Sequence, residues 1–237
     1  CSSLAAFSAF CSSALILFDL ESEARVSKLA THNDPNSENV SRLVGAFNTL
    51  CFGTTSGLTA MIDIRSADRV FSKSLSGSIC SLDLWDNRLL ACSLEEITIL
   101  DLRMIGNEGR YTYGALPIGS GICSAQFNMH KDGAKVVSSA VGGRKIKRFD
   151  LDLNMCCDAL RVQSSVLSMT PSSETNEFAV LEPDLSQAEL VVNFYSQRSG
   201  KIRDQLKVPA DCYQISYDKT GNSLICMGAK SIRIHST

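Results

Sequence analysis

The chain has 237 residues, of which 44% are hydrophobic and 20% charged, and its formal net charge is -2. Disordered chains have fewer apolar residues and a larger net charge, so this composition indicates a globular protein. The near-neutral charge argues against general nucleic-acid binding, which needs an excess of Lys and Arg. The longest apolar run, residues 14–18, is far too short for a membrane-spanning helix, so we expect no membrane partner.

The ten cysteines are dispersed, and several lie in apolar runs such as TLCFG and LICMG. In such runs a free cysteine behaves as a small buried hydrophobic residue. No C-x-x-C spacing occurs, and the three histidines, His32, His130 and His235, have no cysteine nearby. We therefore expect no structural metal and an intracellular protein, cytoplasmic or nuclear. Because the chain starts at Cys1 rather than Met, we also expect an excised or truncated piece.

A short apolar-Asp-apolar unit recurs along the chain, at Asp19, Asp63, Asp101 and Asp150. These aspartates are 44, 38 and 49 residues apart, and degenerate units follow at Asn193-Phe194-Tyr195 and in the last residues. Each unit closes a run such as LTAMIDI or EITILDL, whose length and β-branched residues are typical of a strand. A period of about forty residues predicts a repeat architecture.

Each repeat contains further strand-like runs separated by turns. Runs such as ICSLDLWDN and CYQISYDKTGN end in Asp, Asn and Gly, the residues that tight hairpins favour. A second run such as RLLACSLEE precedes the Asp unit, and a shorter run such as RVFSKSLSG follows it. Four short strands per repeat predict an all-β protein, a β-propeller of four-stranded antiparallel blades without a core helix.

Residues 50–63, LCFGTTSGLTAMID, resemble the WD-repeat propellers, with a small-residue strand, a Gly turn and a strand that ends in Asp. Ile62 replaces the family's tryptophan, and Leu100, Phe149 and His235 take that place in other repeats. No blade carries the Trp-Asp ending or an opening Gly-His, and the single Trp85-Asp86 closes a first strand. The chain is therefore identified as a divergent member of this family.

The repeats predict one propeller domain over residues 1–237. The expected blade pieces are residues 1–39, 40–77, 78–120, 121–163, 164–210 and 211–237. Two arrangements remain open, a six-bladed ring and an incomplete seven-bladed ring. In the first, as the resemblance implies, residues 1–10 supply the strand that the last blade lacks.

No sequence motif supplies a catalytic site, since G-x-S-x-G, P-loop and H-E-x-x-H patterns are absent. Gly142-Gly143 is interpreted as a hairpin turn, His130 as a surface residue and His235 as a packed histidine with its hydrogen bonds satisfied. We therefore expect neither enzymatic activity nor a cofactor, and a propeller enzyme is the less favoured alternative.

The densest charged segment contains Arg144, Lys145, Lys147 and Arg148. Alternation along a strand places Arg148 where other repeats bury an apolar side chain, so its guanidinium needs a carboxylate, carbonyls or water. The cluster is either a basic spot for an acidic peptide, a phosphate or a lipid headgroup, or an exposed or salt-bridged strand.

Two consecutive blades end in Asp-x-Arg, formed by Asp63 with Arg65 and Asp101 with Arg103. The family resemblance implies a role here, because this ending marks many substrate receptors of cullin-RING ubiquitin ligases. The alternative is a local pair that braces the turn.

The leading hypothesis is a non-catalytic scaffold that binds other proteins or peptides on the propeller faces, as a subunit or adaptor of a larger complex. The polar insertions at residues 31–39, 104–110 and 182–187 are the expected recognition loops. The alternative is a ubiquitin-ligase receptor that binds the ligase adaptor.

Overall fold

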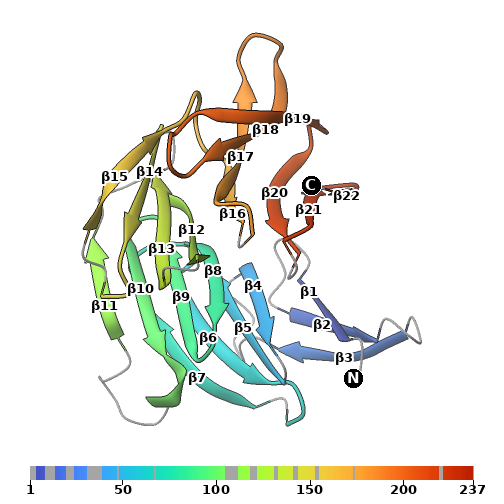
Figure 1. The fold of residues 1–237 in the computed structure, drawn as a ribbon. Coiled ribbons are helices and arrows are strands. Elements are labelled where there is room, and N and C mark those ends of the chain that lie inside the picture. Colours follow the sequence, from blue (N-terminus) through green and yellow to red (C-terminus); the bar gives the residue numbers. More distant parts are fainter. Residues whose placement is uncertain are drawn as a thin grey trace. The chain divides into compact units, whose positions relative to one another are not determined.

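The computed structural model describes residues 4–8, 14–19, 24–30, 39–46, 48–66, 68–104, 112–117, 122–130, 133–140, 144–152, 155–172, 174–218 and 221–236. Within these ranges the chain forms strands β1–β22, and a 3-10 turn at Leu102–Met104 is the only helical element (Figure 1). All strands lie in antiparallel sheets of three or four strands. The predicted all-β propeller class is confirmed.

Six sheets follow one another along the chain, and we number them in that order. Sheet 1 consists of β1 (Leu4–Ser8), β2 (Ala14–Asp19) and β3 (Ala24–Ala30). Sheet 2 consists of β4 (Val40–Ala46), β5 (Thr49–Thr54), β6 (Leu58–Asp63) and β7 (Arg69–Ser74). Sheet 3 consists of β8 (Ile79–Trp85), β9 (Arg88–Ser93), β10 (Glu96–Asp101) and β11 (Thr112–Pro117).

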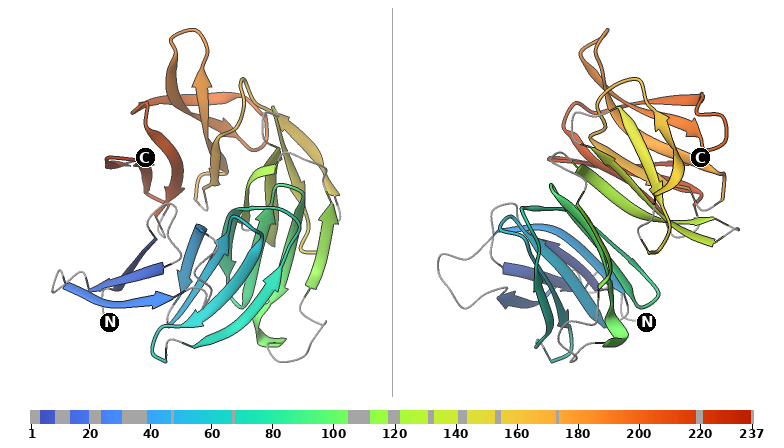
Figure 2. Two further views of the ribbon diagram at one scale, coloured as in Figure 1. Left: turned by 180° about the vertical axis from the view of Figure 1, so that it is seen from behind. Right: turned by 90° about the vertical axis from the view of Figure 1, so that its left-hand side faces the viewer.

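Sheet 4 consists of β12 (Ile122–His130), β13 (Gly133–Ala140), β14 (Lys145–Phe149) and β15 (Met155–Arg161). Sheet 5 consists of β16 (Ser168–Pro171), β17 (Glu177–Asp184), β18 (Glu189–Ser196) and β19 (Ile202–Val208). Sheet 6 consists of β20 (Cys212–Tyr217), β21 (Ser223–Gly228) and β22 (Ile232–Ser236). In every sheet the strands lie in chain order. Figure 2 shows the same ribbon from behind and from the side.

The hairpins form where the sequence offers residues that tolerate a tight turn. Trp85 pairs with Arg88 across β8 and β9, which leaves Asp86 and Asn87 as a two-residue loop. Asp86 has a φ of 52°, the left-handed conformation that such loops require. The guanidinium of Arg88 lies 5.1 Å from the centre of the Trp85 ring. Trp85 thus closes a first strand, as the sequence predicted.

The first strand belongs to a different sheet from the one that the closed six-bladed arrangement predicts. Leu4–Ser8 pairs with β2, where Leu4 lies opposite Asp19, and this hairpin belongs to sheet 1. Sheet 6 has three strands, in the order β20-β21-β22. The alternative in which residues 1–10 complete the last sheet is therefore wrong for Leu4–Ser8, the described part of that segment. A pairing with β2, close by in sequence, closes a much shorter loop than a pairing with the last sheet would.

Contacts divide the chain into two compact units, Cys1–Thr112 and Tyr113–Thr237. In the first unit, sheets 2 and 3 pack closely at Gly53. A Cβ at this position would lie 2.4 Å from Cγ2 of Ile79, the first residue of sheet 3. Ser41 adds a polar contact there, because its Oγ donates to the Ile79 carbonyl at 2.6 Å. Glycine at position 53 is thus a consequence of sheet-on-sheet packing.

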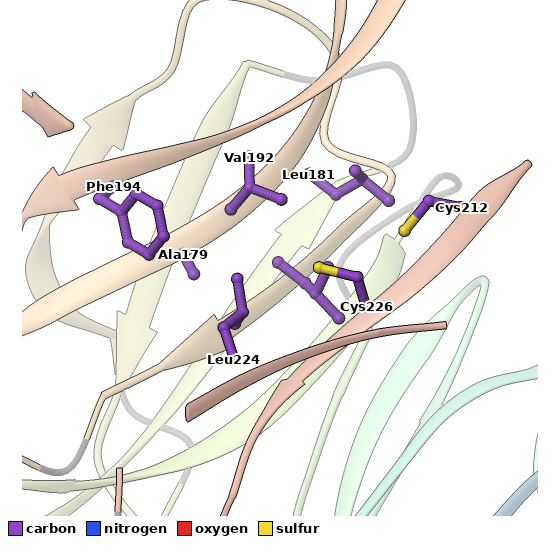
Figure 3. Packing of buried hydrophobic residues seen from close by; sticks show 8 residues of the cluster. Ala179, Leu181, Val192, Phe194, Cys212, Leu224 and Cys226 are labelled. Atoms are coloured by element: carbon purple, nitrogen blue, oxygen red, sulfur yellow. The ribbon is translucent and has the colours of Figure 1, made fainter. Parts of the chain in front are cut away.

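In the second unit, sheet 5 packs on sheet 4 with one face and on sheet 6 with the other. Successive residues of β17 point to opposite faces, so Phe178 and Val180 join one core while Ala179 and Leu181 join another. The first core includes Ile146 of β14. The second core is shown in Figure 3, and its members from sheet 6 are Cys212, Ile215, Leu224 and Cys226. A sheet buried on both faces is what stacked propeller blades require.

A β-bulge recurs in the first strand of four sheets. In each case the register shifts by one residue against the second strand. The residues carried in the bulges are Ser41, Cys80, Cys123 and Tyr213. The bulge is a repeat feature that the apolar alternation of the sequence does not reveal.

Candidate interaction site

A cavity of about 320 Å³ lies in sheet 5, at the end where β17 turns into β18. Three structural elements supply its walls: the segment before β16, the β17–β18 hairpin and β19. The lining residues are Gln163, Ser164, Glu182, Pro183, Asp184, Leu185, Ser186, Val191, Asn193 and Gln205. Leu185 is 75% exposed beside this cavity, so an apolar side chain stands at its rim.

Glu182 is the buried acid of this cavity. It lies on β17 on the same face as Phe178 and Val180, and only 1% of the residue is exposed. Its Oε2 accepts hydrogen bonds from Asn193 Nδ2 at 2.6 Å and from the Tyr195 hydroxyl at 2.9 Å. Its Oε1 accepts from the Ser164 amide at 3.3 Å. One carboxylate thus connects β17, β18 and the segment that enters sheet 5.

Further hydrogen bonds extend this network. The Tyr195 hydroxyl accepts from the Gln163 amide at 2.9 Å. Gln205 Nε2 donates to Asn193 Oδ1 at 2.9 Å, and these two residues are paired across β18 and β19. The network therefore spans three strands and holds the cavity walls in one geometry.

Burial determines the electrostatics of the cavity. It raises the pKa of Glu182 against the opposing hydrogen bonds from Asn193 and Tyr195, and it also raises the pKa of Tyr195. At the rim, hydrogen bonds from Ser186 lower the pKa of Asp184. Lys207 forms an ion pair of 2.8 Å with Glu189. The cavity therefore combines a buried acid with a more acidic carboxyl group at its edge.

The sequence predicted a polar loop at residues 182–187, and the structure corrects its beginning. β17 continues to Asp184, so Glu182 is a buried strand residue rather than part of a loop. The Pro183-Asp184 pair resembles a turn start in sequence, but tertiary packing keeps it in the strand. Residues 31–38 and 105–110 of the other two predicted loops lie outside the described residues.

A second hollow, a groove of about 540 Å³, lies between sheets 5 and 6. Its lining mixes carboxylates, aromatic rings and apolar side chains: Thr175, Glu177, Phe194, Asp204, Gln205, Leu206, Tyr217, Ile234, His235 and Ser236. The buried Nε2 of His235 has no hydrogen-bond partner among the described residues. The expectation of a fully satisfied histidine is thus not met within the described ranges.

The two Asp-x-Arg endings have the same local geometry. Asp63 accepts from the Arg65 amide at 2.9 Å and forms an ion pair with its guanidinium at 2.8 Å. Asp101 accepts from the Arg103 amide at 3.0 Å and likewise binds the Arg103 guanidinium. These hydrogen bonds lower the pKa of both aspartates to about 2. The contacts are those of the turn-bracing alternative.

The basic segment divides between the faces of β14. Ile146 is buried in the core between sheets 4 and 5, while Arg144 and Lys145 are exposed and Lys147 is half-buried. Arg148 donates to the Gln197 carbonyl at 2.8 Å, and its guanidinium lies 5.3 Å from the centre of the Phe178 ring. The predicted need for a carbonyl is thus met by sheet 5. Gly142, Gly143 and the His130 side chain lie outside the described residues.

The described ranges contain neither a candidate metal centre nor a candidate membrane span. There, no group of three or more His, Cys, Asp or Glu side chains is placed to hold a metal ion. No helix in the same part of the chain has the length and hydrophobicity needed to cross a membrane.

Comparison with known proteins gives similarity in structure and none in sequence. No family model and no curated protein matches the chain. A chain in the crystal structure of the mitotic checkpoint complex is similar with a TM-score of 0.73 and 15% identity, over 99% of this chain and 70% of that one. The computationally designed protein Ika8 is similar with a TM-score of 0.69 and 13% identity, over 100% of this chain and 69% of that one. The chain therefore has an all-β propeller fold.

Proposed function

We propose that the chain is a non-catalytic protein-interaction scaffold, a divergent WD-repeat propeller that acts as a subunit or adaptor of a larger complex. In this proposal the six sheets are the blades of one propeller domain, and the loop ends of the blades bind other proteins or peptides. The likeness to a chain from a multi-protein assembly supports the proposal at the level of fold.

The single observation that carries the proposal is the cavity of sheet 5. Its walls belong to strands held by the Glu182 network, so it is preformed. Preformed hollows with a few fixed polar groups and an apolar rim are typical of recognition sites. The Glu182 carboxylate already accepts three hydrogen bonds within the fold, which favours a structural role for this group over proton transfer to a substrate.

The chemistry of the cavity favours a basic side chain next to an apolar one. Asp184 at the edge is acidic, and Lys207 nearby is paired with Glu189 and Gln187. An incoming Lys or Arg would therefore meet carboxylate and amide oxygens, while Leu185 offers an apolar contact. A peptide with that pair of residues is the proposed ligand.

A rim variant tests this function. The double substitution D184N/L185S removes the charge and the apolar contact, while the asparagine side chain keeps an oxygen for the turn hydrogen bond that the Ser186 amide donates at 2.9 Å. We expect recovery of the direct partner in quantitative affinity purification to fall about tenfold, which corresponds to about 1.4 kcal/mol of binding free energy. The measurement compares partner abundance by mass spectrometry.

The matched control is V70S, because Val70 is an exposed apolar residue on β7. It should recover the same partners as the unmodified chain. Equal recovery by D184N/L185S and V70S would show that the cavity rim does not bind partners, and the proposal would then be abandoned.

A second candidate function is a substrate receptor of a cullin-RING ubiquitin ligase. The observation in its favour is that Arg65 and Arg103 present exposed guanidinium groups in equivalent turns of consecutive sheets, with side chains 70% and 57% exposed. The pairing with Asp63 and Asp101 fixes the direction of each guanidinium.

This candidate predicts that R65A/R103A loses the ligase adaptor from an affinity purification. The fold should be retained, because the Arg65 ion pair is exposed and the buried Asp101 keeps the hydrogen bond that the backbone amide of residue 103 donates. R65K/R103K keeps the charge but not the paired geometry, and should recover the adaptor only weakly. Full adaptor recovery by R65A/R103A would exclude the ligase role and leave the scaffold proposal intact.

A further inference from the structure

Two cysteines meet at the bulge of sheet 3. Ile79 pairs with Ser93 and Ser81 pairs with Cys92, so Cys80 is the extra residue between two regular pairs. A bulge places two residues of one strand opposite one residue of its partner. Cys80 therefore shares the position opposite Cys92 with Ser81, although regular alternation would turn it away.

The two sulfur atoms are close. Cys80 Sγ lies 3.6 Å from Cys92 Sγ and 3.3 Å from the Cys92 carbonyl oxygen. Cys92 is fully buried and its Sγ lies 3.4 Å from the Ser93 carbonyl oxygen, whereas Cys80 is partly exposed. Cys80 is therefore the more exposed residue of the pair.

The equivalent bulge in sheet 2 contains no cysteine pair. There Ser41 occupies the bulge, Gly53 lies opposite Arg42, and the Ser41 hydroxyl lies 3.2 Å from the Gly53 carbonyl oxygen. A pair of thiols at the bulge is thus not required by the backbone geometry of the repeat.

The surroundings of the pair favour the thiolate of Cys80. The Cys92 thiol as hydrogen-bond partner, with a smaller effect of Arg42, lowers the pKa of Cys80. Burial opposes this shift at Cys80, and at Cys51 burial raises the pKa of the thiol to about 12. A partly exposed cysteine with a lowered pKa is the more reactive nucleophile.

We propose that Cys80 and Cys92 form a redox-active dithiol that a peroxide converts reversibly into a disulfide. The Cys80 thiolate attacks one peroxide oxygen, the O–O bond breaks, and Cys80 becomes a sulfenic acid while hydroxide takes up a proton to become water. The Cys92 sulfur then attacks the Cys80 sulfur, its proton leaves with the sulfenic hydroxyl as a second water, and the S–S bond forms. In total, two thiols and one hydrogen peroxide give one disulfide and two waters.

The disulfide would fix the bulge next to the contact between sheets 2 and 3. The sulfurs lie 3.6 Å apart and need to approach by about 1.5 Å to reach an S–S bond of about 2.05 Å. The Ile79 carbonyl adjoining Cys80 is the acceptor of the Ser41 hydroxyl from sheet 2. Oxidation therefore acts on a residue directly beside this contact between two blades.

Peptide mapping of the unmodified full chain tests the proposal. Trypsin cleaves after Lys73, Arg88 and Arg103, so Cys80 and Cys92 fall in separate peptides, residues 74–88 and 89–103. After brief treatment with hydrogen peroxide and alkylation, we expect these two peptides to be joined, and dithiothreitol to separate them. Before oxidation, Cys80 should react with iodoacetamide at least about tenfold faster than Cys51.

Three variants assign the roles. In C92S the sulfenic acid of Cys80 should persist and be trapped by dimedone, in C80S Cys92 should remain unoxidised, and C51S should behave as the unmodified chain. Failure to find the joined peptides in the unmodified chain, or equal alkylation of Cys80 and Cys51, would overturn the proposal. Since mapping of the unmodified chain needs no substitution, a variant that fails to fold does not affect the test.

Discussion

Replacing Phe178 by Ala is expected to lower the free energy of unfolding by about 3–5 kcal/mol, the usual cost of removing a buried aromatic side chain. Phe178 is fully buried in the core between sheets 4 and 5, with Ile146 from one sheet and Val180 from the other. Its ring also lies under the Arg148 guanidinium, so the variant leaves a cavity next to a charged group. Urea denaturation followed by fluorescence and circular dichroism would measure the loss.

Two controls separate this effect from a general loss of stability. F178L keeps most of the volume and should lose clearly less than F178A. L185A removes an exposed side chain and should change stability by no more than about 0.5 kcal/mol. A change below about 1 kcal/mol for F178A would contradict the packing of sheet 4 on sheet 5 through this ring.

The substitution E182A is expected to lower the free energy of unfolding by about 3 kcal/mol, because it leaves up to three buried donors without their acceptor. These donors are Asn193 Nδ2, the Tyr195 hydroxyl and the Ser164 amide. E182Q retains the shape and one carbonyl oxygen, and should lose about half as much. Thermal and urea unfolding of both variants would measure the difference, and equal stability of E182A and the unmodified chain would contradict the network.

Glu182 should also make the stability of the fold depend on pH. Burial raises the pKa of Glu182 above its ordinary value of 4.5, so near that pH the folded chain keeps a proton that the unfolded chain has lost. The protonated Glu182 side chain therefore adds to the free energy of unfolding. This stabilisation is complete below pH 4.5 and is lost as the pH rises through the raised pKa of Glu182. The stability advantage of the unmodified chain over E182Q should therefore shrink as the pH rises from about 4 to about 8. A constant difference over that range would contradict the raised pKa.

Much of the fold could be predicted from the sequence, because the strands carry their pattern locally. Runs such as EITILDL and ELVVNFY bury consecutive or alternate side chains, and Asp101 closes its strand as the repeat indicated. The strand Ser168–Pro171 is different, since it has four residues, one β-branched residue and a proline. It forms a strand because β17 pairs with it along its whole length. This pairing depends on a neighbouring strand and not on the local sequence pattern.

The candidate site could be predicted only in part. The sequence indicated the β17–β18 turn as a recognition loop, but the turn signals of Pro183 and Asp184 concealed that Glu182 is a buried acceptor. Its role depends on Ser164, 18 residues away, and on Tyr195, 13 residues away. The acidic residue that directly follows the apolar run FAVL is the signal that could have indicated it, because a buried carboxylate needs partners.

The dithiol was not predictable by spacing. Cys80 and Cys92 are 12 residues apart on paired strands, and only the one-residue register shift of the bulge brings both sulfurs to one place.

The environment of Arg148 could be predicted in part from the sequence. The strand alternation showed that it needs a polar partner, and the partner, the Gln197 carbonyl, comes from the next sheet.

Methyl-selective NOE spectroscopy tests the stacking of sheets most directly, because Val180 and Leu181 are neighbours in β17 and belong to different cores. With labelled Ile, Leu and Val methyl groups, Val180 should show NOEs to Ile146 of sheet 4 and none to Ile215 of sheet 6. Leu181 should show NOEs to Ile215 and none to Ile146. NOEs from both residues to a single neighbouring sheet, or to neither, would contradict a sheet buried between two others and with it the propeller.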